Sequence, residues 1–486
     1  MLSGIVAVNA QVCQPHSLYF METIPQISQM NPAFQPRANG YVALPVNFNV
    51  DIRLPLAMKD ILQKQGNTWY SFLERQYDYK KFWKSIGENS TAILNVGTDI
   101  DILGFGFRAG NSYISFGVSE HVLTTNALSS DIFKITDKGF PPEETLFDLS
   151  DFGSQNIVYK QLRIGFSTKI NKLTIGMNVK PLSGQMAAIS KIQKMELRTS
   201  SQQWSLDVKG DVYSSADIDL ILNEELKISE VEERYSDYTY KDWLQNYVSS
   251  FNNPGIAFDL GASYQINEQL IVSAALNNLG FISWTKDLNG ISANGNYMFD
   301  GIKYDIVEDD RKDMWETLSD TLKNVVEYRV QHNKFKTMLT PVLHLGASYN
   351  LNKSVSLGFL SRSAFWQNNM QQSFNLSLCL QPYSFVAFNA GATWQVKSNV
   401  YFGGGVTFFA GPLQIYLLTD YVPVYYSIYT IEKNNVDKDN GREQIGKFPA
   451  PERQRNITFR VGMNLVFGKH GYINKPMFDK AKNNWY

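Results

Sequence analysis

The sequence predicts an all-β protein, a transmembrane antiparallel β-barrel of about fourteen strands, and three observations carry this prediction. Charged residues form 19% of the chain, below the roughly 25% of an average soluble protein, and aromatic residues reach 13%. No apolar run approaches the roughly 18–20 residues that a membrane helix needs. Alternating apolar and polar segments recur along the chain, which is typical of the strands of a membrane barrel.

One phrase recurs along the chain, at residues 261–276, 346–361 and 391–406, with a looser copy at 165–180. Each full copy has a glycine, a small residue, Ser or Thr and an aromatic residue, then a short polar turn and an alternating exit. Two alternating runs joined by a few polar residues make a β-hairpin. Duplication and common hairpin chemistry both remain open as its origin. Either gives a meander of hairpins, and the irregular spacing argues against a solenoid.

The clearest strand is predicted at residues 456–467, where apolar and polar positions alternate. An Arg or Lys facing the bilayer midplane costs about 2–4 kcal/mol, whereas the lumen tolerates it, so Arg460 should face the lumen. Phe459, Val461, Met463 and Leu465 are then expected to face lipid, and Gly462 and Asn464 to share the lumen face with Arg460.

The same alternation predicts wall strands near 41–54, 91–107, 112–122, 156–169, 173–183, 255–265, 269–284, 338–350, 354–366, 371–381, 385–396, 399–409, 412–425 and 456–467. An even number lets both termini lie on the periplasmic side. The expected periplasmic turns are short. The long segments all fall outside: 55–90, 123–155, 184–254, 285–337 and 426–455.

Two alternatives remain open. Residues 188–214 contain another alternating pair, expected as an extracellular hairpin or as strand extensions; counting them as wall strands gives sixteen. A soluble protein of one or more β-sandwiches would also show alternation. A soluble barrel of fourteen strands is excluded, because side chains could not fill its lumen.

The N-terminal residues 1–10 are interpreted as the remnant of a signal peptide, ending in Val8-Asn9-Ala10, with a buried N-terminal strand as the alternative. We expect a periplasmic or lumenal hatch segment at 11–40, the barrel at 41–467 and a periplasmic tail at 468–486. Cys13 and Cys379 could pair, although Cys379 fits better as a small wall residue.

Three segments carry a resemblance to known families: "MNPAF" (30–34), "KPLSG" (180–184) and "NPGIAFDLGASYQIN" (253–267). They resemble a barrel family of unknown function frequent in Bacteroidota outer membranes. Asn-Pro-Ala before the first strand is similar to the FadL family of long-chain fatty-acid channels, and the chain also resembles barrels of type IX secretion. The FadL resemblance implies fourteen strands and a lumenal hatch containing Asn-Pro-Ala. The large polar loops at 184–254 and 285–337 depart from it.

Asn31, Pro32, Ala33 and Phe34 are the candidate hatch and ligand-gating residues. Pro32 fixes its own φ and disfavours a helical Asn31, which suits a compact plug. A plain turn leading into the barrel is the alternative. A fourteen-stranded pore open to water would leak, and larger barrels are commonly closed by loops or terminal segments.

Two loop segments carry apolar side chains that could capture a ligand or dock a partner. In residues 68–86 these are Trp69, Phe72, Phe82 and Trp83. In residues 311–331 a helical stripe would place Trp315, Leu318 and Leu322 on one face. Packing of these side chains on neighbouring loops is the alternative for both.

No catalytic residues, metal site or cofactor are expected. The acidic stretches 308–310 and 437–441 lack the EF-hand spacing and fit solvated loops. His344 and Ser348 lie on one face of a strand, which is not a catalytic triad.

The sequence therefore predicts an exported protein of a Gram-negative outer membrane. Two functions are carried forward: passive uptake of a hydrophobic or amphipathic small molecule, or a structural or secretion-accessory barrel that binds a protein through its extracellular loops. Outer-membrane lipid is an expected partner. Nucleic acid is not, because 45 basic and 46 acidic residues leave a net charge of −1.

Overall fold

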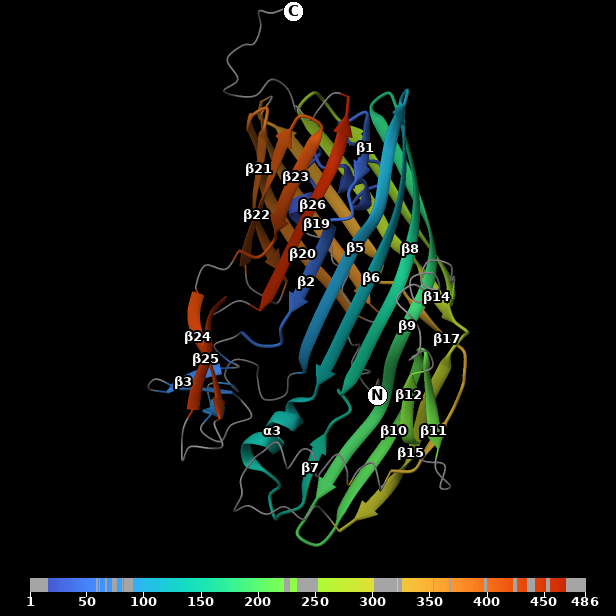
Figure 1. Cartoon of the computed structure of the whole chain (residues 1–486), viewed down its shortest axis with the longest axis vertical. Coiled ribbons are helices and arrows are strands. Elements are labelled where there is room, and N and C mark those ends of the chain that lie inside the picture. Colours follow the sequence, from blue (N-terminus) through green and yellow to red (C-terminus); the bar gives the residue numbers. More distant parts are fainter. Residues whose placement is uncertain are drawn as a thin grey trace, which may run out of the picture.

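The computed structural model describes residues 16–57, 60, 62–65, 68–71, 77–80, 82, 91–222, 228–233, 252–300, 321, 326–352, 354–366, 369–396, 400–422, 426–434, 442–451 and 455–468. Within these residues the chain forms a closed antiparallel barrel of fourteen wall strands (Figure 1). The ring closes because the last strand pairs with the first.

The wall strands, with β1 and β2 as one strand interrupted at residues 44–46, are β1 (Gly40–Ala43) and β2 (Asn47–Arg53), β5 (Ala92–Ala109), β6 (Ser112–Leu128), β8 (Gly153–Ile170), β9 (Leu173–Thr199), β13 (Pro254–Gln265), β14 (Leu270–Trp284), β18 (Val342–Asn350), β19 (Val355–Trp366), β20 (Asn369–Tyr383), β21 (Val386–Gln395), β22 (Val400–Ala410), β23 (Leu413–Thr419) and β26 (Asn456–Phe467). Each predicted wall strand is thereby confirmed. The strand expected at 412–425 ends earlier, at Thr419.

The two ends of the barrel differ in the length of their connections. At one end, the top in Figure 1, strands are joined by short turns such as Gly110-Asn111 and Gly411-Pro412, where the glycines adopt positive φ. At the other end lie the long connections predicted from the sequence. We call these the short-turn end and the long-loop end.

The remaining elements of the described residues are η1 (His16–Leu18), η2 (Pro25–Gln29), β3 (Leu62–Gln65), β4 (Thr68–Ser71), α3 (Ser130–Lys138), β7 (Thr145–Asp148), β10 (Trp204–Ser215), β11 (Ile218–Leu222), β12 (Ile228–Glu233), β15 (Leu288–Phe299), β16 (Tyr328–Val330), β17 (Phe335–Met338), β24 (Tyr426–Asn434) and β25 (Arg442–Pro451). Except for η1 and η2, they belong to the long connections. Among the described residues, no helix combines the length and apolar composition required to cross a membrane.

The pair predicted at 188–214 forms strand extensions rather than two more wall strands. β9 pairs with β13 up to Ser183 and, beyond the wall, with β10, which in turn pairs with β15. β7 and β16 complete this sheet at its two edges. The barrel therefore has fourteen wall strands, and the long-loop end carries a sheet that projects beyond it.

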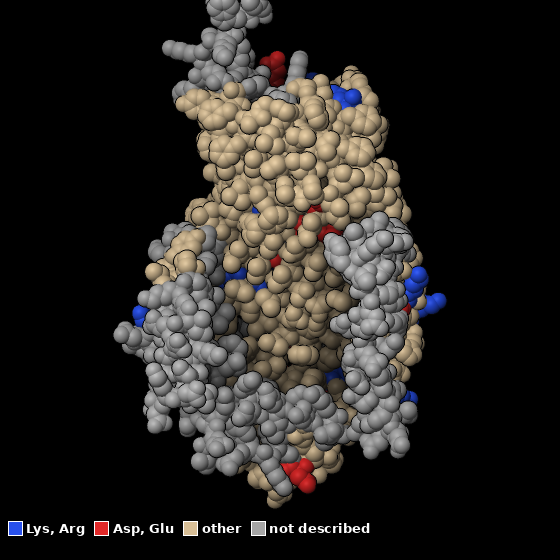
Figure 2. Space-filling view, viewed as in Figure 1, with Lys and Arg blue, Asp and Glu red and all other residues tan. Residues whose placement is uncertain are grey.

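The short-turn half carries an uncharged belt on the face shown in Figure 2. On the face shown in Figure 2, Lys, Arg, Asp and Glu gather at the rim and in the long-loop half. Exposed aromatic side chains lie beside the short turns, as in the aromatic girdles of membrane barrels: Tyr264, Tyr349, Tyr383, Phe385 and Phe467. This distribution matches a bilayer around the belt.

The predicted orientation of β26 is confirmed. Arg460 is 4% exposed and points into the lumen, where it donates a hydrogen bond to Gln29 Oε1 at 2.7 Å. Its neighbours in the strand alternate between buried and partly exposed positions, as expected for a lumen face and a lipid face.

Candidate functional site

The lumen of the short-turn half is occupied by residues 16–39, which we call the hatch. Its side chains and backbone contact strands on every side of the ring, among them β5, β14, β20, β23 and β26. Most of its residues are buried, although the segment contains only two short 3₁₀ turns. The segment therefore fills the lumen as a compact plug held by the wall.

The first residues of the hatch are anchored on one buried carboxylate. Asp420 accepts hydrogen bonds from the backbone N–H groups of His16 and Ser17, and its Oδ2 lies 2.8 Å from His16 Nδ1. His16 Nε2 lies 2.8 Å from Ser373 Oγ. The chain of contacts from Ser373 through His16 to Asp420 resembles a hydrolase triad. Ser373 is only 5% exposed, however, and Asp420 also binds the backbone N–H groups of the hatch. These contacts fit an anchor.

Side-chain amides of the wall hold the middle of the hatch by its carbonyl groups. Gln414 donates to Thr23 O at 2.7 Å, and Asn178 donates to Ser28 O at 3.4 Å. Asn277 donates to two successive carbonyls, those of Gln29 at 3.2 Å and Met30 at 2.9 Å. The wall therefore binds residues 23–30 of the hatch partly through their backbone carbonyls.

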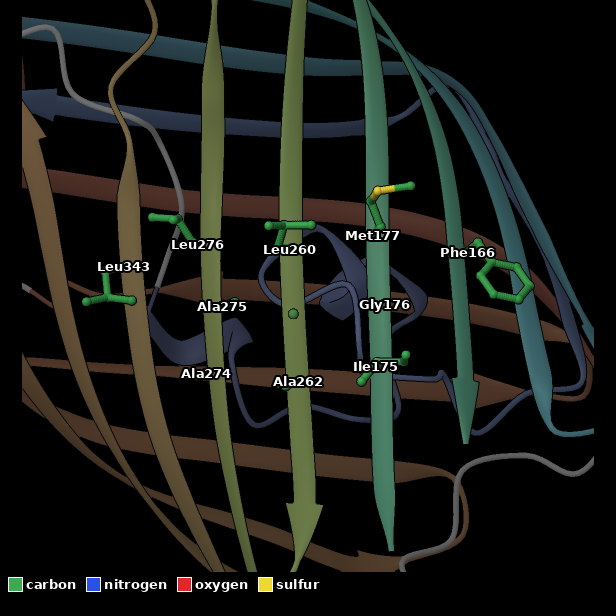
Figure 3. Close-up of a pocket in the computed structure, with 11 residues that line it drawn as sticks. Phe166, Ile175, Gly176, Met177, Leu260, Ala262, Ala274, Ala275, Leu276 and Leu343 are labelled. Carbon is green, nitrogen blue, oxygen red and sulfur yellow. The ribbon is translucent and has the colours of Figure 1, made fainter. Parts of the chain in front are cut away.

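The predicted gating residues Asn31, Pro32 and Ala33 sit on two glycines of the wall. A Cβ built on Gly176 would lie 2.2 Å from Pro32 O, and one built on Gly261 would lie 2.1 Å from Asn31 Oδ1. No other residue fits at such close approach. In Figure 3 the hatch, dark blue, passes directly behind β9, β13 and β14.

The glycines of the repeated phrase form part of this seat. Gly261 faces Asn31, and Gly346, at the same place in the second copy, faces the Tyr19 ring, with Cε1 2.6 Å from a built Cβ. Gly391 in the third copy meets only wall atoms. The sequence displayed this signal in the repeated glycine, but nothing in the pattern revealed what would pack on it.

Tyr19 links the hatch to itself and to the wall. Its hydroxyl lies 3.0 Å from Ser273 Oγ and accepts a hydrogen bond from Asn31 Nδ2. Its ring packs edge-on against the Phe34 ring, with 5.1 Å between the ring centroids. Burial raises the pKa of the Tyr19 hydroxyl, and these two hydrogen bonds oppose the rise. Phe34, predicted to meet the wall, is thus held partly through Tyr19.

A layer of charged residues crosses the lumen beside Gln29, on the side of the hatch that faces the long-loop end. It comprises Asp99, Asp101, His121, Arg163, Lys180, Asp259 and Arg460. Lys180 pairs with Asp259 at 2.6 Å, His121 with Asp99 at 2.6 Å, and Arg460 with Asp101 at 3.5 Å. A cavity of about 50 Å³ among these side chains also touches Gln29. A buried charge is tolerated here because it is paired.

Two larger cavities flank this region. One, of about 540 Å³, lies near the long-loop end and mixes apolar residues such as Phe152, Ile189 and Leu339 with polar ones such as Lys191. The other, of about 500 Å³, is an open hollow on the lipid-facing side of β9, β13 and β14 (Figure 3). It is lined almost wholly by apolar side chains, including Met177 and Leu260.

The predicted loop residues are not brought together within the described part of the chain. The expectation that Phe82 offers an aromatic surface is wrong, because its side chain is fully buried against Phe133 and the rings of Tyr77 and Tyr79. Trp69 starts this segment in the hairpin strand β4, and its side chain lies outside the described residues. Phe72, Trp83, Trp315, Leu318 and Leu322 also lie outside them.

The helix expected at 311–331 does not extend to its predicted end, because β16 forms there and pairs with β15. His344 and Ser348 form no hydrogen-bonded pair. His344 is fully buried beside the Tyr19 ring, and neither ring nitrogen has a hydrogen-bond partner among the described residues. Cys379 is a free thiol in the wall, as favoured from the sequence, and Cys13, with which it could have paired, lies outside the described residues.

A family model matches residues 32–420, most of the chain: DUF5723, a family of unknown function. No curated protein matches.

Several solved structures are similar over nearly their whole length, at low identity. The Ralstonia pickettii toluene transporter TbuX is 9% identical, with a TM-score of 0.41, covering 96% of this chain and 99% of that one. A Pseudomonas aeruginosa FadL homologue is 12% identical, with a TM-score of 0.42, covering 96% and 98%. The monoaromatic hydrocarbon channel CymD is 11% identical, with a TM-score of 0.43, covering 93% and 94%.

Proposed function

Because this chain belongs to DUF5723, a family of unknown function, we propose its role from its own geometry: passive uptake of hydrophobic or amphipathic small molecules across an outer membrane. The hatch is the gate, and displacement of Asn31–Phe34 opens it. The observation that carries the proposal is the seat of small residues on which this part of the hatch rests.

The seat determines where a passage opens. The part of the inner wall against which the hatch rests is formed by Gly176, Gly261 and Gly346, and Ala275 is the strand partner of Gly261. Side chains that small leave the lumen wide along this arc once the hatch segment moves. The charged layer follows towards the long-loop end, where Lys180 of β9 pairs with Asp259 of β13.

The cavity near the long-loop end is the proposed entry site. Its volume of about 540 Å³ falls in the range of small-molecule sites, roughly 300–1,000 Å³. Apolar side chains such as Phe365 and Pro341 line it together with Lys191 and Lys336. This mixture suits a molecule that has both an apolar body and a polar group.

The exit is proposed along the barrel axis rather than through the wall. The lipid-facing hollow lies directly outside the hatch, but β9 and β13 are paired without a break from Leu173–Tyr264 to Ser183–Pro254. A lateral exit would require breaking that ladder inside a bilayer, where each unsatisfied backbone group costs several kcal/mol. Movement of the hatch breaks its own contacts with the wall, such as the hydrogen bonds of Asn277 to the Gln29 and Met30 carbonyls, and leaves the strand ladders of the wall paired.

A disulfide lock tests the gate in the full-length protein. Phe20→Cys places a second thiol on the hatch beside the native thiol of Cys379 in β20, whose Sγ lies 3.7 Å from Phe20 O. We expect cells carrying the oxidised variant to take up a fluorescent apolar probe more slowly than after reduction. A cysteine pair replacing Lys194 and Asp207, which form an ion pair outside the wall, is the control. Uptake that is insensitive to the lock contradicts gating by this segment.

A structural or secretion-accessory role is the second candidate, and the projecting sheet favours it. β7, β9, β10, β15 and β16 form a sheet beyond the barrel, with α3 and Trp204 packed in one apolar cluster on it. A rigid sheet of this size exceeds what a pore needs. Pull-down with a variant lacking residues 200–203, the β9–β10 turn, would weaken capture of a partner if the sheet is its docking surface, whereas uptake of the probe would remain.

A further inference from the structure

A β-bulge in the wall stands immediately beside the gating residues. Phe258 pairs with Leu279 and Leu260 with Leu276, so Asp259 alone faces the two residues Asn277 and Asn278. Asn278 has a φ of 62°, a conformation that non-glycine residues seldom adopt. Bulges re-aim side chains and are retained where the change of direction is useful.

The Asp259 side chain is completely buried and collects three donors. Its Oδ1 accepts from the backbone N–H of Asn278 at 2.8 Å. Its Oδ2 accepts from Asn178 Nδ2 at 2.9 Å and pairs with Lys180 Nζ at 2.6 Å. Lys180 also donates to Asn278 Oδ1 at 2.9 Å. One carboxylate therefore fixes the bulge and the neighbouring strand together.

The two wall amides that hold the hatch next to its gating residues both depend on this carboxylate. Asn178, which binds Ser28 O, is a direct partner of Asp259. Asn277, which binds the carbonyls of Gln29 and Met30, is presented by the bulge that Asp259 stabilises. These three carbonyls precede Asn31 directly in the chain.

We propose that Asp259 is the positioning residue of the gate: it aims Asn178 and Asn277 at the hatch, and its pairing with Lys180 sets how firmly residues 28–33 are held. The consequence for uptake rests on the proposed function, but the hold itself does not. The cavity of about 50 Å³ beside Lys180 and Asn278 exceeds the roughly 10–15 Å³ that one water needs, so Lys180 has room to leave Asp259.

The test measures the hold directly, in full-length protein carrying Ala33→Cys. Ala33 is 2% exposed, so a thiol there reacts with a water-soluble maleimide only when the hatch lifts. Mass spectrometry of the peptide separates this site from the native cysteines. Asp259→Asn places an amide donor against Asn178 and Lys180, and we expect labelling on the order of tenfold faster, the effect of losing one or two hydrogen bonds.

Asp207→Asn is the matched control, because Asp207 also pairs with a lysine, Lys194, but contacts no hatch residue among the described side chains. It should label at the parental rate. Asn277→Ala removes the hatch contact and leaves the Asp259 partners in place, so it should also speed labelling. Because both changes act on the same contact, the labelling rate of the double variant should increase by less than the product of the two single increases.

Unchanged labelling in Asp259→Asn, with the barrel still folded by heat-modifiable migration, overturns the proposal. If Asp259→Asn does not fold, parental labelling in Asn277→Ala overturns it equally. Faster labelling in Asp259→Asn without any change in uptake would count against the proposed function and leave this inference intact.

Discussion

Gly261 of β13 and Asn31 of the hatch approach so closely that a single methyl group cannot fit between them: a Cβ on Gly261 would lie 2.1 Å from Asn31 Oδ1. That oxygen also accepts a hydrogen bond from Ala33 N at 2.9 Å, which shapes this part of the hatch. The fit of the hatch therefore depends on a wall residue with no side chain.

Gly261→Ala is expected to dislodge the gate while leaving the wall folded. The added methyl overpacks the contact with Asn31, which costs about 1–3 kcal/mol in a well-packed site, and the hatch gives way more readily than the paired wall. Conductance in planar bilayers should rise. Gly391→Ala is the control, since Gly391 occupies the same place in the repeated phrase and its nearest neighbour, at 3.1 Å, is the wall residue Asn375. Equal conductance of both variants would refute the claim that the contact of Gly261 with Asn31 holds the hatch in place.

Arg460→Ala is expected to destabilise the barrel strongly. It removes the partner of Gln29 and leaves Asp101 without its ion pair in the lumen, and breaking a buried pair costs about 3–5 kcal/mol. Arg198→Ala breaks an exposed pair with Glu144 and should cost about 0–1 kcal/mol. The temperature at which heat-modifiable migration is lost measures both. Similar losses for the two variants would contradict the role of the charged layer.

Deletion of residues 24–38 is expected to leave a folded barrel with a wider pore. The wall begins at Gly40, and the wall groups that lose their partners in the deletion, such as Asn277 and Asn464, can bind water in the lumen. Permeability to large antibiotics should increase. A folded deletion variant with unchanged permeability would show that the segment is no plug, and the structural function would then be favoured over uptake.

Phe34→Ala should give a weaker form of the same leak. Its ring makes an edge contact with Tyr19, and such aromatic pairs contribute about 0.5–1.5 kcal/mol beyond their buried area. Single-channel recording compares it with the deletion. A leak equal to that of the deletion would mean that Phe34 alone keeps the hatch closed.

The protein is expected to fractionate with outer membranes and to migrate faster on gels before heating than after. A closed barrel has no free edge at which detergent can begin unfolding, since β26 pairs with both β1 and β2. Recovery as a soluble periplasmic monomer would refute the membrane assignment.

The wall could be predicted because its information is local. Alternation places each strand, and the one charge at Arg460 decides which face meets lipid. The hatch was a hypothesis from the position of Asn-Pro-Ala before the first strand, with a plain turn as its alternative. The seat could not be predicted, because a repeated glycine reports only that something lies close.

The residues that anchor the hatch could not be predicted, because they lie far apart in the sequence. His16 and Asp420 are separated by 404 positions, and no spacing rule connects them. Asp259 reads as one polar residue in an alternating strand, and only the bulge gives it three partners. The prediction for Phe82 was wrong for another reason: a loop aromatic was assumed to be exposed, but it packs with Phe133 of a different connection in a shared apolar core.

The strand that closes the ring also binds the hatch. β26 pairs with β1 and β2, and the same strand brings Arg460 to Gln29 and Asn464 to Gln26, a pair 438 positions apart. Contacts this distant in the chain form slowly, because a long loop must close before they contribute any stability. Barrel closure and hatch binding should therefore occur together, as one late step of assembly. A partly assembled barrel would then be open both along its seam and through its lumen, and the completed barrel would be closed at both.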